Sequence, residues 1–273
     1  MSETLRDRIK AVFFDIDDTI YSKDTDQLSP GIEKVFTRLQ QRGIVPGIAT
    51  GRARYIFPPV LEAVLARTGV ERFVTINGQL NLHRQDLVSD YPIAADDVAR
   101  IVRYFQGEGV PLAFAGRTRM AVDRDDPRFN AALDPITREH PVDPHAAERH
   151  AVYQVIAGYD ESREAAVQAS GVLDGGRFKT VRWHPDAVDV LNVEGSKVRG
   201  IRDMIAPLGL TLDNVMVFGD SLNDIEMLSE AGFGVAMGNG HPQAIARADF
   251  RARPQAEGGV FHALVDLGLI DGD

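Results

Sequence analysis

AVFFDIDDT, residues 11–19, is the stretch that decides the fold. Four apolar residues, Ala11 to Phe14, run directly into an acidic cluster, which is typical of a strand buried on both faces of a parallel sheet. Ligands of open α/β sheets bind at the carboxyl ends of such strands. Side chains two residues apart on an extended chain point the same way, so we expect Asp15 and Asp17 to face one pocket. An ordinary acidic turn after a strand is the competing interpretation of this motif taken alone.

Strand and helix patterns alternate around this stretch. Apolar residues at positions 32, 35, 36 and 39 have helical spacing, and the apolar runs at 44–49 and 73–76 read as strands. The same alternation returns with strands expected at 188–191 and 215–218 and a helix at 197–208. Strands separated by helices of this length predict a parallel sheet of the α/β class.

The middle of the chain has a different composition. Strand-like runs at 112–115, 153–157 and 178–182 surround a segment, 123–149, that is rich in Asp, Pro, Arg and His. We therefore expect two domains. We expect residues 1–80 and 189–273 to form a discontinuous, Rossmann-like α/β core, and residues 81–188 to form an inserted α+β cap.

Composition excludes several classes of function. The 273 residues carry 30 Lys+Arg against 40 Asp+Glu, and the formal charge of −10 opposes a nucleic acid or an anionic membrane as a partner. The absence of cysteine excludes disulfides, thiolate catalysis and cysteine-ligated metals. No apolar run approaches the roughly 18 residues that span a bilayer, and the charged N-terminal segment is unlike a secretory signal, so we expect a cytoplasmic protein. No heptad indicates an interface, so a monomer is the default expectation.

A second acidic cluster, VFGDSLND, occupies residues 217–224 and again follows an apolar run. Asp220 is expected at the strand end, and Asp224 can share a helical face with it. The competing interpretation is a helix N-cap, a position that Asp and Asn favour.

Two further positions suggest anion binding. At the end of the expected strand 44–49, Thr50 can donate to an anionic oxygen, and Gly51 lets backbone N–H groups approach it. Lys197 lies at a helix start, where a cation opposes the helix dipole and so suggests a role other than stability. Taken singly, an ordinary turn and a solvated surface lysine explain them equally well.

Together, the order D-x-D-x-T, Thr, Lys and G-D-x-x-N-D resembles the haloacid dehalogenase (HAD) superfamily of phosphatases. The resemblance covers nearly the whole chain and is closest to the Cof-type (HAD-IIB) branch, whose large α+β cap lies between the second and third motifs. Ile76-Asn77-Gly78 and the run 237–240, MGNG, also resemble that branch, where such pairs flank the active site. Asp18 is a departure, because many relatives have glycine there.

The resemblance implies a Mg²⁺-dependent phosphatase that hydrolyses a small phosphate monoester through an aspartyl-phosphate. A sugar phosphate is the leading substrate, with pyridoxal phosphate and flavin mononucleotide also open. Asp15 would be the nucleophile, and Asp17 the general acid and then the general base. Mg²⁺ would be held by the carboxylates of Asp15 and Asp220 and by the backbone carbonyl of Asp17.

The remaining roles that the resemblance implies concern the phosphoryl group and its surroundings. Thr50 and Lys197 would hold the phosphoryl oxygens, while Asn223 and Asp224 would anchor the metal and the lysine from behind. Four residues are expected to bind substrate: Gly51, Arg52, Asn77 and Gly78.

Rival interpretations stay open at this point. A phosphomutase acting on a hexose phosphate could use the same core. A dehalogenase attacks carbon and would leave Asp17 idle. Residues 219–222 spell the GDSL signature of serine esterases, with Ser221 as nucleophile, but no aspartate has the histidine three residues later that would supply a base. A non-catalytic binding module would be expected to lack a catalytic residue, and none is missing.

Overall fold

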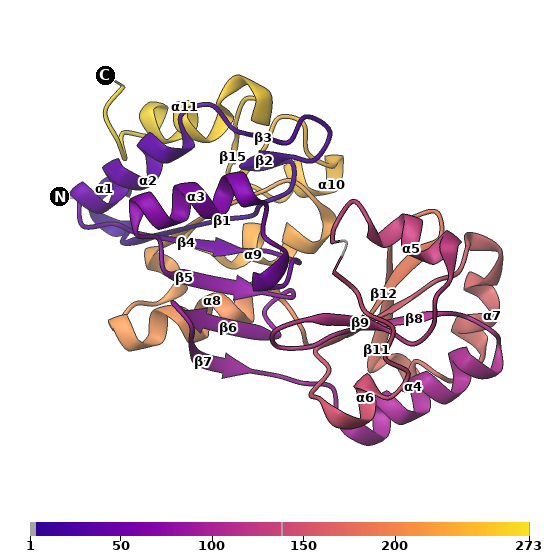
Figure 1. Ribbon diagram of the computed structural model, residues 1–273. Helices are drawn as coiled ribbons and strands as arrows, with labels where there is room; N and C mark the ends of the chain where they lie inside the picture. The colour runs from indigo at the N-terminus through magenta and orange to yellow at the C-terminus, as the bar shows by residue number, and fades with distance from the viewer. Residues whose placement is uncertain (1–3, 138, 273) are drawn as a thin grey trace. The chain divides into compact units, whose positions relative to one another are not determined.

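The computed structural model describes residues 4–137 and 139–272, and its residues fall into two compact units (Figure 1). Unit 1 comprises Met1–Arg52, Phe57–Asp90 and Ser196–Asp273, and unit 2 comprises Ala53–Ile56 and Tyr91–Gly195. Among the described residues, no helix has both the length and the apolar character needed to cross a bilayer.

Unit 1 is built on a sheet of eight strands, in which every neighbouring pair from β15 to β5 is parallel and β6 and β7 are added antiparallel. From one edge to the other the strands are β15 (Phe250–Arg251), β14 (Phe233–Ala236), β13 (Val215–Gly219), β1 (Ala11–Phe14), β4 (Val45–Ala49), β5 (Arg72–Thr75), β6 (Leu80–His83) and β7 (Asp86–Asp90). The predicted α/β class with a dominant parallel sheet is confirmed.

Helices cover both faces of this sheet, and strand β1, whose side chains alternate between the two faces, is buried on both. Ala11 and Phe13 pack with α8, α9 and α10, whereas the Phe14 ring lies 5.5 Å from the Phe36 ring of α2 on the other face. In Figure 1, α2, α3 and α11 lie on the opposite side of the sheet from α8. The helices of unit 1 are α1 (Leu5–Arg8), α2 (Ile32–Gln41), α3 (Pro59–Thr68), α8 (Lys197–Ile205), α9 (Ile225–Glu230), α10 (Pro242–Ile245) and α11 (Gly259–Asp266).

Short elements complete unit 1. A two-stranded hairpin follows β1, and single 3₁₀ turns connect the later elements. They are β2 (Tyr21–Ser22), β3 (Gln27–Leu28), η4 (Ala206–Leu208), η5 (Leu212–Asn214), η6 (Leu222–Asp224) and η7 (Gln255–Glu257).

Unit 2 contains a five-stranded antiparallel sheet with helices on both faces. Phe114, Val155 and Val190 pack with α4 and α7 on one face, and Ala113 and Ile156 pack with α5 on the other. The strands, in sheet order, are β11 (Phe178–His184), β12 (Ala187–Asn192), β10 (Gln154–Ala157), β8 (Leu112–Ala115) and β9 (Met120–Val122). The helices and turns are η1 (Arg54–Ile56), α4 (Ala95–Gly107), α5 (Pro127–Leu133), α6 (Ala146–Arg149), η2 (Glu161–Arg163), α7 (Glu164–Ala169) and η3 (Asp174–Gly176).

The predicted domain boundaries at 80/81 and 188/189 differ from the division seen here. Residues 81–90 belong to the core sheet, because β6 pairs with β5 and β7 pairs with β6. The strand expected at 188–191 as the return to the core is β12, which pairs antiparallel with β10 and β11 in unit 2. A short apolar strand has the same local pattern in either sheet, so its partner could not be read from the sequence.

Candidate active site

Two strand ends bring the acidic motifs together in unit 1. Phe14 of β1 is in parallel register with Phe218 of β13, and the Asp15 N–H donates to the Phe218 carbonyl at 2.9 Å. Asp15 and Asp220 follow these strands and therefore lie at the same edge of the sheet. Both residues are buried, with exposed fractions of 5% and 8%.

Lys197 supplies the positive charge of this cluster. It is the first residue of α8, whose N-cap Ser196 accepts the Arg199 N–H with its side chain, and it is 1% exposed. Its Nζ lies 2.6 Å from Asp15 Oδ1 and 2.6 Å from Asp224 Oδ1. Burial alone would lower the pKa of the ammonium, but the two carboxylates raise it above its usual value, so Lys197 stays charged.

Asp224 is fully buried, and both of its oxygens are engaged. While Oδ1 contacts Lys197, Oδ2 accepts the backbone N–H groups of Asp220 and Ser221 at 2.9 Å each. A β-carbon at Gly219 would lie 2.6 Å from the Asp224 carboxyl carbon, so glycine is required there for this close approach. Asp224 is thus placed to orient the loop after β13 and the lysine.

The carboxylates suit a hard divalent cation. Asp15, Asp220 and Asp224 each offer an oxygen within 4.8 Å of the others, and Thr19 Oγ1 donates to Asp220 Oδ1 at 2.9 Å. Burial raises the pKa of Asp15 and of Asp220, and the neighbouring negative charges raise both further. A divalent cation would relieve this repulsion, and carboxylate oxygens are the donors that Mg²⁺ or a similar ion prefers. The residues present therefore fit the metal that the sequence suggested.

Asp17 lies near this cluster but has a different partner. Its two carboxylate oxygens accept hydrogen bonds from Arg52 Nε and Nη2, both at 2.8 Å. The Arg52 guanidinium also lies 5.7 Å from the centre of the Tyr21 ring. Arg52, expected to bind substrate, is therefore seen holding Asp17.

The loops after β4 and β5 complete the same edge. Buried Thr50 donates its N–H to the Val74 carbonyl of β5, and its Oγ1 accepts the Arg52 N–H at 3.1 Å. Asn77 Oδ1 accepts a hydrogen bond from Asn223 Nδ2 at 3.0 Å. Hydrogen bonds link the expected site residues into two groups: Asp15, Lys197, Asp220 and Asp224 form one, and Asp17, Thr50, Arg52, Asn77 and Asn223 form the other. Gly51 lies against the Asn77 amide, and Gly78 lies against the Ser196 carbonyl that precedes Lys197.

The structure also shows residues that support the site and that the sequence alone does not predict. The sequence pattern alone assigns no role to Thr19, the last residue of D-x-D-x-T, yet its hydroxyl donates to Asp220 Oδ1. Asp18 adopts a left-handed backbone with φ of 57°, a conformation that favours glycine. Its carbonyl accepts Asn239 Nδ2 at 2.8 Å, while Asn239 Oδ1 accepts the Gln255 N–H. The MGNG run was the available signal for Asn239.

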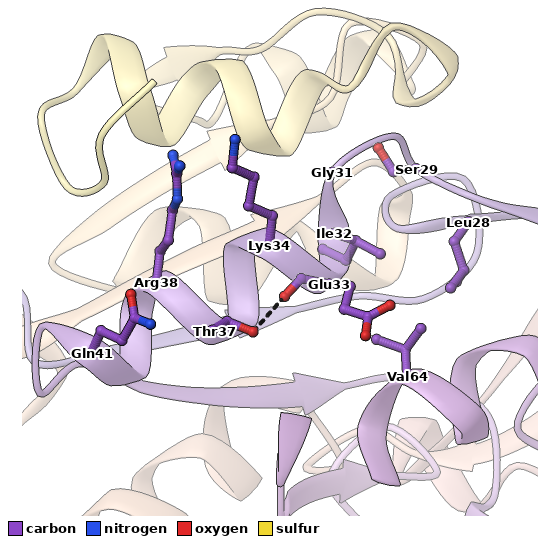
Figure 2. Close-up of a pocket in the computed structure, with 10 residues that line it drawn as sticks. All are labelled: Leu28, Ser29, Gly31, Ile32, Glu33, Lys34, Thr37, Arg38, Gln41 and Val64. Carbon is purple, nitrogen blue, oxygen red and sulfur yellow. Dashed lines mark hydrogen bonds between the residues drawn. The ribbon is translucent and has the colours of Figure 1, made fainter. Parts of the chain in front are cut away.

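A separate surface pocket of about 740 Å³ lies along α2 and contains none of these residues (Figure 2). Lys34 and Arg38 extend from α2 toward α11, where they lie 5.5 and 5.9 Å from the Phe261 ring. Among the described residues that line this pocket, Glu33 is the single acidic one, and it pairs with Arg67, so they provide no carboxylate cluster.

The comparisons with known proteins agree with one another. The sequence matches the haloacid dehalogenase-like hydrolase family over residues 12–264. A putative bifunctional phosphatase/peptidyl-prolyl cis-trans isomerase of Streptococcus pyogenes serotype M6 is 35% identical over 265 residues, covering 97% of this chain but only 55% of that relative. The putative phosphatase YkrA of Bacillus subtilis is 31% identical over 263 residues, covering 96% of this chain and 98% of the relative. The solved HAD subclass IIB sugar phosphatase BT4131 is 27% identical with a TM-score of 0.84, covering 96% of this chain and all of that one.

Proposed function

Because the chain belongs to the haloacid dehalogenase-like hydrolase family, we propose that it hydrolyses a small phosphate monoester at the carboxyl edge of the unit 1 sheet. Family membership and the phosphatase relatives make it an enzyme of the phosphatase class. The observation that carries the proposal is the buried Lys197 ammonium, which contacts Asp15 and Asp224 beside Asp220. A charged cluster withdrawn from water in this way is costly to fold and is typical of a catalytic site.

Asp15 is the proposed nucleophile. Lys197 contacts Oδ1, which leaves Oδ2 to attack phosphorus. As the Asp15–phosphorus bond forms, the bond to the ester oxygen breaks, and the departing alkoxide takes a proton from Asp17. Water then attacks phosphorus and gives its proton to Asp17, and the aspartyl-phosphate bond breaks to release inorganic phosphate. Arg52 must free one Asp17 oxygen for these transfers, because it holds both in the structure.

The phosphoryl oxygens are assigned to Thr50 and Lys197. Thr50 Oγ1 accepts the Arg52 N–H, so its own hydroxyl proton is free to be donated to a phosphoryl oxygen. Lys197 holds its charge against two carboxylates and is rigidly placed, which is the preorganisation that stabilises developing charge.

A divalent cation is part of the proposal, with Mg²⁺ as the ion. It would be held by the Asp15 and Asp220 carboxylates and the Asp17 main-chain carbonyl, and it would neutralise charge on the phosphoryl group. Thr19 and Asp224 orient this donor set, Thr19 through the Asp220 carboxylate and Asp224 through the Asp220 N–H.

A sugar phosphate is the proposed substrate class, supported by the likeness to the sugar phosphatase BT4131. We also propose that unit 2 corresponds to the inserted cap expected from the sequence. The serine-esterase alternative is not supported, because no histidine is hydrogen-bonded to Ser221 in the described part of the chain.

The test is phosphate release from p-nitrophenyl phosphate, sugar phosphates, pyridoxal phosphate and flavin mononucleotide, with Mg²⁺ and with EDTA. We expect Mg²⁺-dependent release that Asp15→Asn abolishes and that Asp18→Asn, a matched change in the same acidic run, retains. Equal turnover in Asp15→Asn would overturn the nucleophile. Return of the phosphoryl group to a hexose phosphate, instead of its release, would identify a phosphomutase.

A further inference from the structure

The turn after β5 has a backbone conformation that is energetically unfavourable for the residues in it. Ile76, Asn77 and Gly78 all have left-handed φ angles, of 49°, 51° and 79°. Glycine and asparagine tolerate this region, but a β-branched residue such as isoleucine is a clear outlier there. Backbone of this kind persists only where surrounding contacts fix it, and it clusters at functional sites.

Hydrogen bonds tie the turn to the loop after β4. The Ile76 N–H donates to the Arg52 carbonyl and the Asn77 N–H to the Thr50 carbonyl, both at 3.0 Å. The Ile76 side chain is 1% exposed, so packing also holds it. The turn is therefore fastened to both ends of the Thr50–Arg52 loop.

The same turn touches the start of α8. A β-carbon at Gly78 would lie 2.1 Å from the Ser196 carbonyl oxygen and 3.2 Å from the Gly200 nitrogen. Only glycine permits this approach, and Ser196 is the residue before Lys197. The turn thus sets the spacing between the loop carrying Thr50 and the helix carrying Lys197.

The Asn77 side chain reaches a third loop. It is 7% exposed, and its Oδ1 accepts the hydrogen bond from Asn223, 146 residues away in the chain. A β-carbon at Gly51 would lie 3.4 Å from both polar atoms of the Asn77 amide and 3.6 Å from Asn223 Nδ2. The amide pair therefore lies directly against Gly51, next to Thr50.

We propose that Asn77 is a positioning residue that acts through Asn223. An amide nitrogen carries two N–H donors, and Asn77 takes one of those on Asn223, which fixes the other next to Gly51 as a donor for a phosphoryl oxygen. The inference rests on the proposed phosphatase function. It replaces two expectations, that Asn77 itself binds substrate and that Asn223 acts only on the metal and the lysine, and it explains why a strained turn is kept at this strand end.

The test uses Asn77→Gly, which removes the amide while glycine accepts the φ of 51° without strain. It is combined with Asn223→Ala in a double-mutant cycle on kcat/KM for p-nitrophenyl phosphate, with calorimetric binding of inorganic phosphate as a second readout. Each single variant should lower kcat/KM by about tenfold and weaken phosphate binding, and the double variant should lose no more than either one. The matched control is Arg84→Gly, an exposed left-handed residue in the β6–β7 turn, which should leave both readouts unchanged.

Independent losses in the double variant, about a hundredfold in total, would overturn the inference. So would an Asn77→Gly enzyme with wild-type kinetics and phosphate affinity. If Asn77→Gly only lowers the melting temperature and its activity is recovered on cooling, the turn has a purely structural role. That result would also overturn the inference. Absence of turnover in the wild type would instead count against the proposed function, and phosphate binding would still decide the role of Asn77.

Discussion

Replacing Lys197 by methionine tests whether the charges of the site are truly withdrawn from water. Methionine keeps most of the volume of the side chain but removes the ammonium that contacts Asp15 and Asp224 at 2.6 Å. Removing one partner of a buried ion pair leaves an uncompensated charge and destabilises a protein by about 3–5 kcal/mol. At roughly 2–4 °C per kcal/mol for a domain of this size, Lys197→Met should melt about 6–20 °C lower without added divalent cation.

The loss should also depend on pH. Without the lysine, burial and mutual repulsion raise the pKa of Asp15 and Asp220 with no cation to oppose them. A carboxyl whose pKa is raised by folding holds its proton more tightly when folded, so stability falls as the pH rises past its unfolded value of about 4. The deficit of Lys197→Met should therefore be larger at about pH 8 than at about pH 5.

Far-UV circular dichroism is the assay: heating gives the melting temperature, and urea at about pH 5 and about pH 8 gives the free energy of unfolding. The single tryptophan, Trp183, lies in unit 2 and would not report on unit 1. The matched variant is Lys197→Met/Asp224→Asn, which removes one of the stranded carboxylates and can still accept the backbone N–H groups of Asp220 and Ser221. It should be more stable than Lys197→Met alone. A Lys197→Met protein as stable as the wild type, or a double variant less stable than Lys197→Met, would refute the reasoning.

Three further predictions concern other parts of the chain. Gly78→Ala should lose at least about 2 kcal/mol in urea unfolding, because its β-carbon would collide with the carbonyl oxygen before α8, whereas Gly209→Ala, equally left-handed but in open space, should lose less; equal losses would contradict the close approach. Asp189 accepts the Trp183 Nε1 hydrogen bond, and burial raises its pKa to about 7. Asp189→Asn should therefore stabilise unit 2, followed by tryptophan fluorescence, more at about pH 8 than at about pH 5, and a gain that does not depend on pH would contradict the raised pKa. Mg²⁺ at a hundredfold excess over its Kd should raise the melting temperature by about 5–10 °C, and Asp220→Asn should remove that shift; a shift that survives in the variant would place the ion elsewhere.

The local sequence pattern predicted the elements in which every side chain, or one continuous face, is buried along the whole length. The run 11–14 is apolar throughout and is buried throughout, and the helical spacing at Ile32, Val35, Phe36 and Leu39 matches the buried stripe of α2. Pairing between strands is not a local property. The β6–β7 extension and the placement of β12 in unit 2 depend on which sheet edges are available, so neither domain boundary can be located from the local sequence pattern.

The same distinction, between local pattern and contacts that join distant parts of the chain, applies to the site. The acidic motifs and Lys197 could be singled out because each breaks a local rule, as a charge at the end of a buried strand or a cation at a helix start. Their pairing could not, because it joins residues far apart in the chain. Arg52 holding Asp17 and Asn223 bonded to Asn77 depend on how neighbouring strand ends are spaced, and only the assembled sheet sets that spacing.

The most direct measurement of the central claim is the fate of the phosphoryl group in Asp17→Asn. p-Nitrophenolate leaves without a proton, so this variant should still form the aspartyl-phosphate but lack the base that hydrolyses it. After rapid acid quench, peptide mass spectrometry should find the phosphoryl group on Asp15, in an amount that matches a burst of nitrophenol. The double variant Asp15→Asn/Asp17→Asn should carry no phosphoryl group. A burst with no label, or a label on another residue, would contradict the account.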